Sequence, residues 1–145
     1  MIGVGIDLVE VDRFRRVLAR RPRVADRLFT EGERASLERR KDPVPGLAAR
    51  FAAKEAVMKA LGVGVGAFRF ADVEVRRLSS GAPELSVSGR AAELADSLDV
   101  GGWSVSLTHT DRTAAAVVVA RPAGAVELAR PAGAVELARP AGASR

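Results

Sequence analysis

Three residues in the middle of the chain could take part in phosphate or metal chemistry. Lys54, Glu55 and Lys59 lie in RFAAKEAVMKALG, residues 50–62, which has the composition of a helix and stops on a glycine. At 100° per residue, Glu55 and Lys59 lie one turn apart on a face that the apolar positions do not share. An exposed Glu–Lys pair at this spacing is ordinarily a surface ion pair worth about 0.3–0.5 kcal/mol. A chemical role therefore requires further polar groups close by.

Asp7 is a carboxylate that could supply such a group. Residues 2–8 alternate between aliphatic side chains and the set Gly3, Gly5 and Asp7, which is the pattern of a half-buried strand. A carboxylate beside two glycines lies where a helix, another backbone or a ligand can approach closely. If the central helix packs across this face, Asp7 and Glu55 meet. The alternative is that Asp7 only caps the end of the strand.

Two carboxylates would suit a magnesium ion, which is bound by few protein oxygens and keeps waters and substrate phosphates. Lys54, Lys59 and the amides of the glycine-rich loop after Gly62 would then be available for phosphate oxygens. His109, the only histidine, stands in SLTHT at the end of a predicted strand. It could donate to a phosphate, transfer a proton or join the acids as a metal ligand, and its spacing does not choose among these roles.

The elements that must position these residues indicate an α+β domain, with antiparallel strands, helices and a long central helix. Asp12 is expected to cap a helix that runs to the residue before Pro22, and Thr30 and Glu33 have the spacing of a capping box. KDPVPG is expected to break the chain before the central helix, and Gly62 to end that helix as a left-handed cap. The remaining expected elements are a hairpin from 72–78 and 84–88, a short helix over 90–98, and strands over 103–110 and 113–120.

Length and composition set broad limits. The chain has 145 residues and no cysteine, which favours one domain and excludes disulfides and thiolate metal sites. The N-terminus lacks a basic stretch followed by an apolar run, and no segment approaches the ~20 apolar residues of a membrane span. We therefore expect an untargeted cytoplasmic protein.

The arginines are concentrated near the N-terminus. The net charge is +5, and residues 13–27 contain seven arginines against the single acid Asp26. Such a patch predicts an anionic partner. An acidic protein is favoured over nucleic acid, because single-strand binders interleave basic residues with aromatics and only Phe14 lies inside the patch.

The C-terminal segment repeats itself. RPAGAVELA at 121–129 recurs unchanged at 130–138, and a further copy begins at 139. Nine residues interrupted by proline and glycine are too few for a solenoid unit. We place the boundary of the domain near Arg121, with residues 1–120 as the domain and 121–145 as a flexible, low-complexity tail.

Taken together and in this order, GVGIDLVEVDRF, RFAAKEAVMKALG and SLTHT resemble the bacterial holo-[acyl-carrier-protein] synthase family, a branch of the 4'-phosphopantetheinyl transferases. The pattern F-x-x-K-E-A-x-x-K-A is intact from Phe51 to Ala60, and the resemblance covers about residues 1–120. It implies the fold of these transferases and an Mg²⁺-dependent reaction in fatty acid and lipid biosynthesis. In that reaction the 4'-phosphopantetheine group of coenzyme A passes to a serine of an apo acyl carrier protein, releasing adenosine 3',5'-bisphosphate.

The resemblance also implies roles for individual residues. Asp7 and Glu55 match the metal ligands, and Asp7, Glu55 and Lys59 form the catalytic set. The positions that match the coenzyme A site are Arg50, Lys54, Lys59, Gly62, Gly64, Gly66, His109 and Thr110. The arginines expected to contact the acidic carrier protein are Arg13, Arg16, Arg20, Arg21, Arg23 and Arg27. The family usually forms a ring of three subunits that share their sites, so a homotrimer is implied.

Two other functions stay open at this point. A basic RNA-binding protein would explain the arginines but would leave Asp7, Glu55, Lys59 and His109 without a purpose. A metal-dependent phosphohydrolase would use the same acids to activate water in place of a carrier serine.

Overall fold

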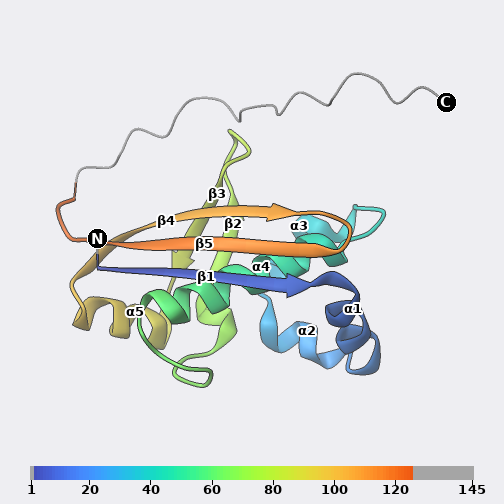
Figure 1. Cartoon of the computed structure of the whole chain (residues 1–145), viewed down its shortest axis with the longest axis horizontal. Coiled ribbons are helices and arrows are strands. Elements are labelled where there is room, and N and C mark those ends of the chain that lie inside the picture. Colours follow the sequence, from blue (N-terminus) through green and yellow to red (C-terminus); the bar gives the residue numbers. More distant parts are fainter. Residues whose placement is uncertain (1, 126–145) are drawn as a thin grey trace.

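The computed structural model of the protein describes residues 2–125, which form helices and two antiparallel sheets (Figure 1). This confirms the predicted α+β class and the long central helix, α4. The elements in chain order are β1 (Gly3–Glu10), α1 (Val11–Arg20), α2 (Arg23–Leu28), α3 (Glu31–Glu38), α4 (Val44–Ala60), the 3₁₀ helix η1 (Phe70–Asp72), β2 (Val73–Arg77), β3 (Pro83–Val87), α5 (Gly89–Ser97), β4 (Val100–His109) and β5 (Thr113–Pro122).

Helix α4 packs on one face of the larger sheet. That sheet has the strand order β1-β5-β4, with both neighbouring pairs antiparallel, and the predicted hairpin β2–β3 forms the second sheet. Small side chains fill much of the core between α4 and the larger sheet, among them Ala53 and Ala56 of α4 and Ala116 and Ala120 of β5. Helix and sheet can therefore approach closely.

The closest approach is between β1 and α4. A Cβ atom added at Gly3 would lie 1.9 Å from the carbonyl oxygen of Ala60, and one added at Gly5 would lie 1.8 Å from that of Ala56. Any side chain at either glycine would push the helix off the strand. The glycine face of β1 is therefore the face that packs against α4, as the expected meeting of Asp7 with the central helix requires.

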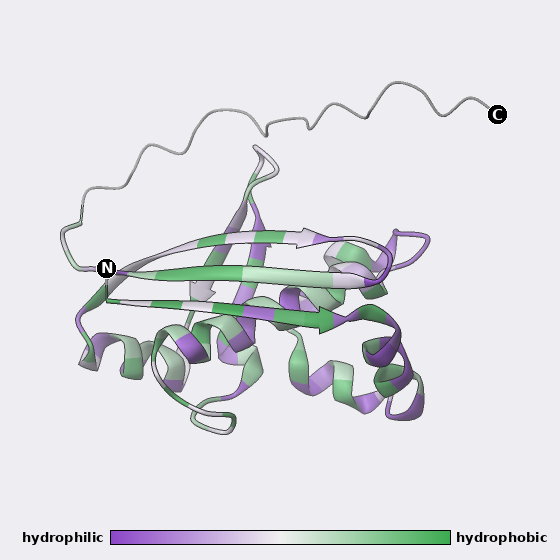
Figure 2. Cartoon of the chain, viewed as in Figure 1, coloured by the Kyte–Doolittle hydropathy of each residue, from purple (hydrophilic) through white to green (hydrophobic). Residues whose placement is uncertain are grey.

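The aliphatic face of β1 points the other way. Val4, Ile6 and Leu8 are 54%, 62% and 68% exposed, and Val117 of the neighbouring strand β5 is exposed as well. Figure 2 shows hydrophobic segments along β1 in green. The alternation predicted for this strand is present, but its buried side is the glycine side and its aliphatic side chains remain at the surface.

The ends of α4 differ in how well they were predicted. KDPVPG does not break the chain throughout, because α4 already begins at Val44, with Pro45 in the first turn where a missing N–H is tolerated. The predicted left-handed cap at Gly62 is confirmed by its φ of 69°. The Val63 amide donates to the Met58 carbonyl over 3.0 Å, which closes the helix end.

The N-terminal helices bring one correction and one confirmation. Asp12 does not cap α1, since it lies within the first turn and Glu10 is the N-cap residue, without a side-chain hydrogen bond. The chain also forms the short helix α2 after Pro22, which was not predicted. The capping box at the start of α3 is confirmed: the Glu33 amide donates to Thr30 Oγ1 over 3.2 Å, and the Thr30 amide donates to Glu33 Oε2 over 3.0 Å.

Strand β5 continues to Pro122, so ordered structure extends slightly past the boundary expected near Arg121. The Arg121 side chain donates to the Trp103 carbonyl of β4 over 3.2 Å. This contact ties the C-terminal end of β5 to β4. Most of the repeat segment, residues 126–145, lies outside the described residues. Within residues 2–125, no helix is both long and apolar enough to cross a membrane.

Candidate active site

Asp7 and Lys59 meet where β1 passes under α4. Lys59 Nζ donates to Asp7 Oδ1 over 2.8 Å and to the carbonyl oxygen of Ile6 over 2.9 Å. The Asp7 side chain is 17% exposed and that of Lys59 is 50% exposed, so the pair opens to solvent on the lysine side. A lysine ammonium has three donors. One donor of Lys59 therefore remains for a ligand oxygen.

Glu55 lies one helical turn before Lys59 and is half-buried. Burial raises the pKa of the Glu55 carboxyl, and the negative charge of Asp7 raises it further, while Lys59 acts in the opposite direction. The structure thus brings Asp7, Glu55 and Lys59 into one group, and the two carboxylates repel each other with a single lysine as their counter-charge. An added cation would be stabilised between them.

The donor set fits Mg²⁺ better than a metal that needs an all-protein site. Within residues 2–125, no group of three or more His, Cys, Asp or Glu side chains could hold an ion. Two carboxylates that leave room for waters and phosphate oxygens match the coordination that Mg²⁺ prefers.

His109 belongs to a different pocket. It ends β4 and lines a cavity of about 260 Å³ together with Arg40, Arg50, Arg76 and Arg77. None of the side chains that line this cavity is acidic. The residues Asp7, Glu55 and Lys59 do not line it, so the structure disfavours His109 as a metal ligand of that group. The arrangement instead creates a basic pocket suited to an anion.

Arg50 is the buried member of the basic pocket. Its guanidinium donates to the Gly46 carbonyl over 3.3 Å and to Ser36 Oγ over 3.1 Å, while Nε has no hydrogen-bond partner among the described residues. Burial lowers the pKa of Arg50, and the nearby Glu33 opposes that effect. A bound anion would satisfy this guanidinium.

Thr110 shapes the turn between β4 and β5. Its hydroxyl oxygen accepts from the amides of Arg112 and Thr113 over 3.2 and 3.1 Å. These contacts fix the end of β4, and with it the backbone of His109. Thr110 therefore acts on the basic pocket through the turn, in addition to any direct contact with a ligand.

Lys54 does not lie where a coenzyme A ligand could reach it. Its side chain is fully buried, and Nζ donates to Glu33 Oε2 over 2.8 Å, to the Phe70 carbonyl over 2.9 Å and to the Val73 carbonyl. All three donors are used. This placement argues against the prediction that Lys54 binds coenzyme A.

The glycine-rich loop, residues 62–69, follows the C-terminal end of α4. The Gly62 amide donates to the Lys59 carbonyl over 3.1 Å, so it is not free for a phosphate. The carbonyl end of a helix also disfavours an anion. Added Cβ atoms at Gly62, Gly64 and Gly66 would meet nothing within 4 Å, which leaves open space above the loop. The loop could therefore contribute to ligand binding in two ways only. Its glycines leave room for a ligand to approach, and its other backbone amides could donate to that ligand.

The arginines of α1 and α2 form an exposed basic surface. Within the described residues, no ion pair involves the six predicted arginines, whereas Arg15 is paired with Asp42 at 2.7 Å. These six are Arg13, Arg16, Arg20, Arg21, Arg23 and Arg27.

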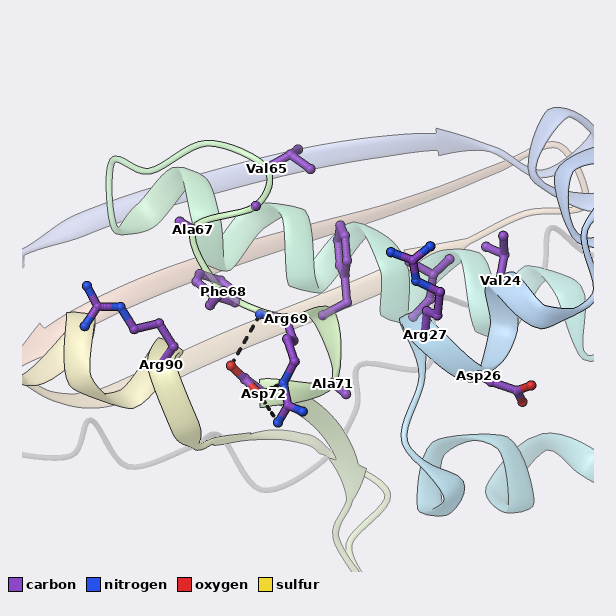
Figure 3. Close-up of a pocket in the computed structure, with 13 residues that line it drawn as sticks. Val24, Asp26, Arg27, Val65, Ala67, Phe68, Arg69, Ala71, Asp72 and Arg90 are labelled. Carbon is purple, nitrogen blue, oxygen red and sulfur yellow. Dashed lines mark hydrogen bonds and ion pairs between the residues drawn. The ribbon is translucent and has the colours of Figure 1, made fainter.

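A large groove lies beside this basic surface. It has a volume of about 880 Å³, and Figure 3 shows Val24 and Arg27 on one side and Val65, Ala67 and Phe68 on the other. Asp7, Glu55 and Lys59 do not line this groove. It therefore offers apolar contact area next to the arginines rather than a second reaction centre.

Sequence reasoning missed the arginines that surround His109. Arg76 and Arg77 stand on β2, and Arg40 follows α3, so only the packing of the hairpin against α4 brings them to the end of β4. No local spacing could have revealed that grouping.

Comparisons with known proteins show what the chain is similar to. Residues 3–118 match the 4'-phosphopantetheinyl transferase superfamily. The holo-[acyl-carrier-protein] synthase of Streptomyces avermitilis is 51% identical over 120 residues, covering 83% of this chain and 97% of the relative. That of Moorella thermoacetica is 46% identical over 119 residues, covering 82% and 93%.

Solved structures have a similar fold. The crystal structure of the synthase from Neisseria meningitidis superposes with a TM-score of 0.76 at 31% identity, covering 83% of this chain and 98% of that one. The Helicobacter pylori synthase, solved in complex with coenzyme A, has a TM-score of 0.71 at 29% identity, covering 81% and 99%.

The raised pKa of Glu55 predicts how pH changes the stability of the metal-free protein. A carboxyl whose pKa is raised by folding favours the folded state fully below its ordinary value of 4.5, and that contribution is lost as pH rises through the folded-state value. Glu55→Gln keeps the uncharged form at all pH values. We expect this variant to melt at a higher temperature than the parent protein at pH 7 in EDTA, with the difference vanishing near pH 4.

Glu38→Gln is the matched control, since Glu38 is exposed at the end of α3, away from Asp7. An equal effect of both substitutions, or a difference for Glu55→Gln that persists at pH 4, would contradict the proposed repulsion.

Proposed function

The chain belongs to the 4'-phosphopantetheinyl transferase superfamily, and we infer that it transfers the 4'-phosphopantetheine group of coenzyme A to a serine of an apo acyl carrier protein at Asp7, Glu55 and Lys59. The products are the holo carrier protein and adenosine 3',5'-bisphosphate. The observation that carries this assignment is the group of two carboxylates and a lysine with one spare donor, held where β1 crosses α4.

The reaction requires little covalent work from the enzyme. The carrier serine Oγ attacks the β-phosphorus of the coenzyme A pyrophosphate, a new P–O bond forms, and the bond to the adenosine bisphosphate breaks. Catalysis of such transfers comes mainly from positioning and from neutralising charge on the phosphate oxygens. The spare donor of Lys59 would serve a phosphate oxygen. Because the nucleophile belongs to the partner, no serine-centred triad is needed.

The serine proton must also be removed. In the metal-free protein, the raised pKa of Glu55 makes its carboxylate a stronger proton acceptor than an exposed glutamate, an effect that a bound cation opposes. Asp7 and Glu55 are also the residues that would hold Mg²⁺, which when bound supplies positive charge to the pyrophosphate. In both roles, the orientation of Glu55 relative to Asp7 depends on the packing of α4 on the glycine face of β1.

Intact-mass analysis of an apo acyl carrier protein tests the function directly. Incubation with this protein, coenzyme A and Mg²⁺ should add one phosphopantetheine group to the carrier. Glu55→Gln should slow that transfer by about 100-fold or more, whereas Glu38→Gln should leave it unchanged. Breakdown of coenzyme A without any carrier would instead favour the phosphohydrolase.

The basic pocket would bind the far end of coenzyme A. The phosphates of coenzyme A are anionic, and Arg50 and His109 line a cavity that has no acidic side chain. The pocket lies on the β4 side of the larger sheet, while Asp7 and Lys59 lie at β1, the opposite edge strand. This separation supports a site completed by a neighbouring subunit, with the basic pocket of one chain beside the carboxylates of the next.

The exposed aliphatic face of β1 supports the same assembly. Val4, Ile6 and Leu8, with Val117 of β5, form an apolar stripe on a strand whose other face is already covered by α4. A stripe of this kind is typical of an association surface. We therefore propose that three copies associate through it.

Replacing one side chain of the stripe tests the assembly. Ile6→Asp should lower the native mass in multi-angle light scattering from three chains to one, and reduce transfer activity by at least about tenfold. Leu98→Asp, at an exposed aliphatic residue after α5, is the matched control and should change neither. A monomeric parent protein at assay concentration would overturn the proposal.

The arginine surface would dock the acidic carrier protein. Its six arginines are exposed, and the groove beside them offers Val24, Leu28 and Val65 for apolar contacts. Exposed charges mainly determine the rate and salt dependence of association. The carrier would thus arrive close to Asp7, since α1 follows β1 without a gap.

Removing part of this charge should weaken docking selectively. The triple variant Arg13→Ala, Arg16→Ala and Arg20→Ala should raise the KM for the carrier about 10- to 100-fold at low salt and flatten its salt dependence. The KM for coenzyme A should stay unchanged. Arg39→Ala, at an exposed arginine after α3, is the control. An unaltered KM for the carrier in low salt would contradict the proposal that the arginine surface docks the carrier.

The family match and the named synthases remove the reason to prefer RNA binding, which would leave the carboxylate–lysine group without a role. A cytoplasmic location and a place in fatty acid biosynthesis stay predictions.

A further inference from the structure

Lys54 is a fully buried cation that the reaction chemistry does not use. Its ammonium donates to one carboxylate, Glu33, and to two backbone carbonyls, those of Phe70 and Val73. The ring of Phe29 lies over it at 5.6 Å from Nζ to the ring centre. Burial lowers the pKa of Lys54, and the negative charge of Glu33 opposes that shift. The charge is therefore held by contacts that are all internal.

Glu33 is the buried anion of this pair and has further partners. Its Oε2 also accepts from the Thr30 amide over 3.0 Å, and its Oε1 accepts from the Val75 amide over 2.9 Å. One carboxylate thus joins the start of α3, the strand β2 and Lys54 of α4. Replacing such a pair by apolar residues of similar size is often neutral or stabilising in proteins. Stability alone gives no reason for charges here.

The pair follows the free edge of β2. Lys54 donates to the carbonyl of Val73, and Glu33 accepts from the amide of Val75, two residues further along the same strand. The other edge of β2 pairs with β3. Lys54 and Glu33 therefore supply the donor and the acceptor that a further strand would otherwise provide. Charged groups have one advantage over apolar ones here. Each hydrogen bonds to a particular backbone atom of β2 and so fixes the position of the strand.

The third contact of Lys54, with the Phe70 carbonyl, fastens the end of the glycine-rich loop to α4. The loop leaves α4 where the Val63 amide bonds the Met58 carbonyl, over 3.0 Å. It returns to α4 where the Phe70 carbonyl accepts from Lys54, over 2.9 Å. Between these points Gly64 and Gly66 meet no neighbouring atoms on their Cβ side. Both ends of the loop are thus fastened to the helix that carries Glu55 and Lys59.

We propose that Lys54 is a positioning residue, which holds the glycine-rich loop against α4 so that the loop lies correctly for coenzyme A; this rests on the proposed function of the site. Lys54 acts through the Phe70 carbonyl and does not touch the substrate. Glu33 keeps the ammonium in place. Of the two lysines in the K-E-A-x-x-K segment, Lys54 therefore anchors the loop. Lys59 is the one that contacts the phosphates.

The double variant Glu33→Gln with Lys54→Met tests the proposal without leaving a buried unpaired charge, which Lys54→Met alone would leave on Glu33. Lys41→Met, at an exposed lysine before α4, is the matched control. In the double variant the KM for coenzyme A should rise about tenfold, while the KM for the carrier and kcat stay within about threefold. A smaller folded fraction would lower only kcat, so it cannot produce this split.

Hydrogen–deuterium exchange provides a readout that does not depend on activity. Peptides covering residues 61–70 should exchange at least about tenfold faster in the double variant, while peptides from β4 and β5 stay at the parent rate. An unchanged KM for coenzyme A, or faster exchange throughout the domain, would overturn the positioning role. Absence of any transfer by the parent protein would refute the proposed function instead, and the exchange comparison would still decide whether Lys54 anchors the loop.

Discussion

The contact between the backbones of β1 and α4 is the constraint on which the rest of the molecule depends. It exists because Gly3 and Gly5 place no atoms where the carbonyls of Ala60 and Ala56 lie. The same approach brings Asp7 beneath Glu55 and Lys59, two residues that helical periodicity alone would leave as a surface ion pair. Packing of small residues thus brings the two carboxylates and the lysine together, since no separate loop delivers the carboxylate to the helix.

Two lysines on one helix illustrate how burial divides similar side chains between tasks. Lys59 uses two donors on β1 and keeps one for a ligand, whereas Lys54 spends all three inside the protein. Only the second is tied to a buried carboxylate. A segment with so many alanines has little amphipathic contrast, so its pattern of hydrophobic residues did not show which lysine faces the interior.

The parts of the fold that could be predicted were those with local causes. The capping box of Thr30, the cap at Gly62 and the β2–β3 hairpin each follow from residues close together in the chain. The meeting of Asp7 with α4 was inferred from two glycines. The burial of Lys54 and the grouping of arginines around His109 depend on elements far apart in sequence, and no local pattern encodes them.

The exposed face of β1 has a consequence for how the protein behaves on dilution. Its larger aliphatic side chains do not contribute to the core of their own chain, because the glycine side faces inward. In the proposed assembly those side chains are buried only when a neighbour is present, so part of the stability of each chain comes from mass action. Thermal resistance would then rise with protein concentration, and a cell would keep this enzyme folded partly by keeping it abundant.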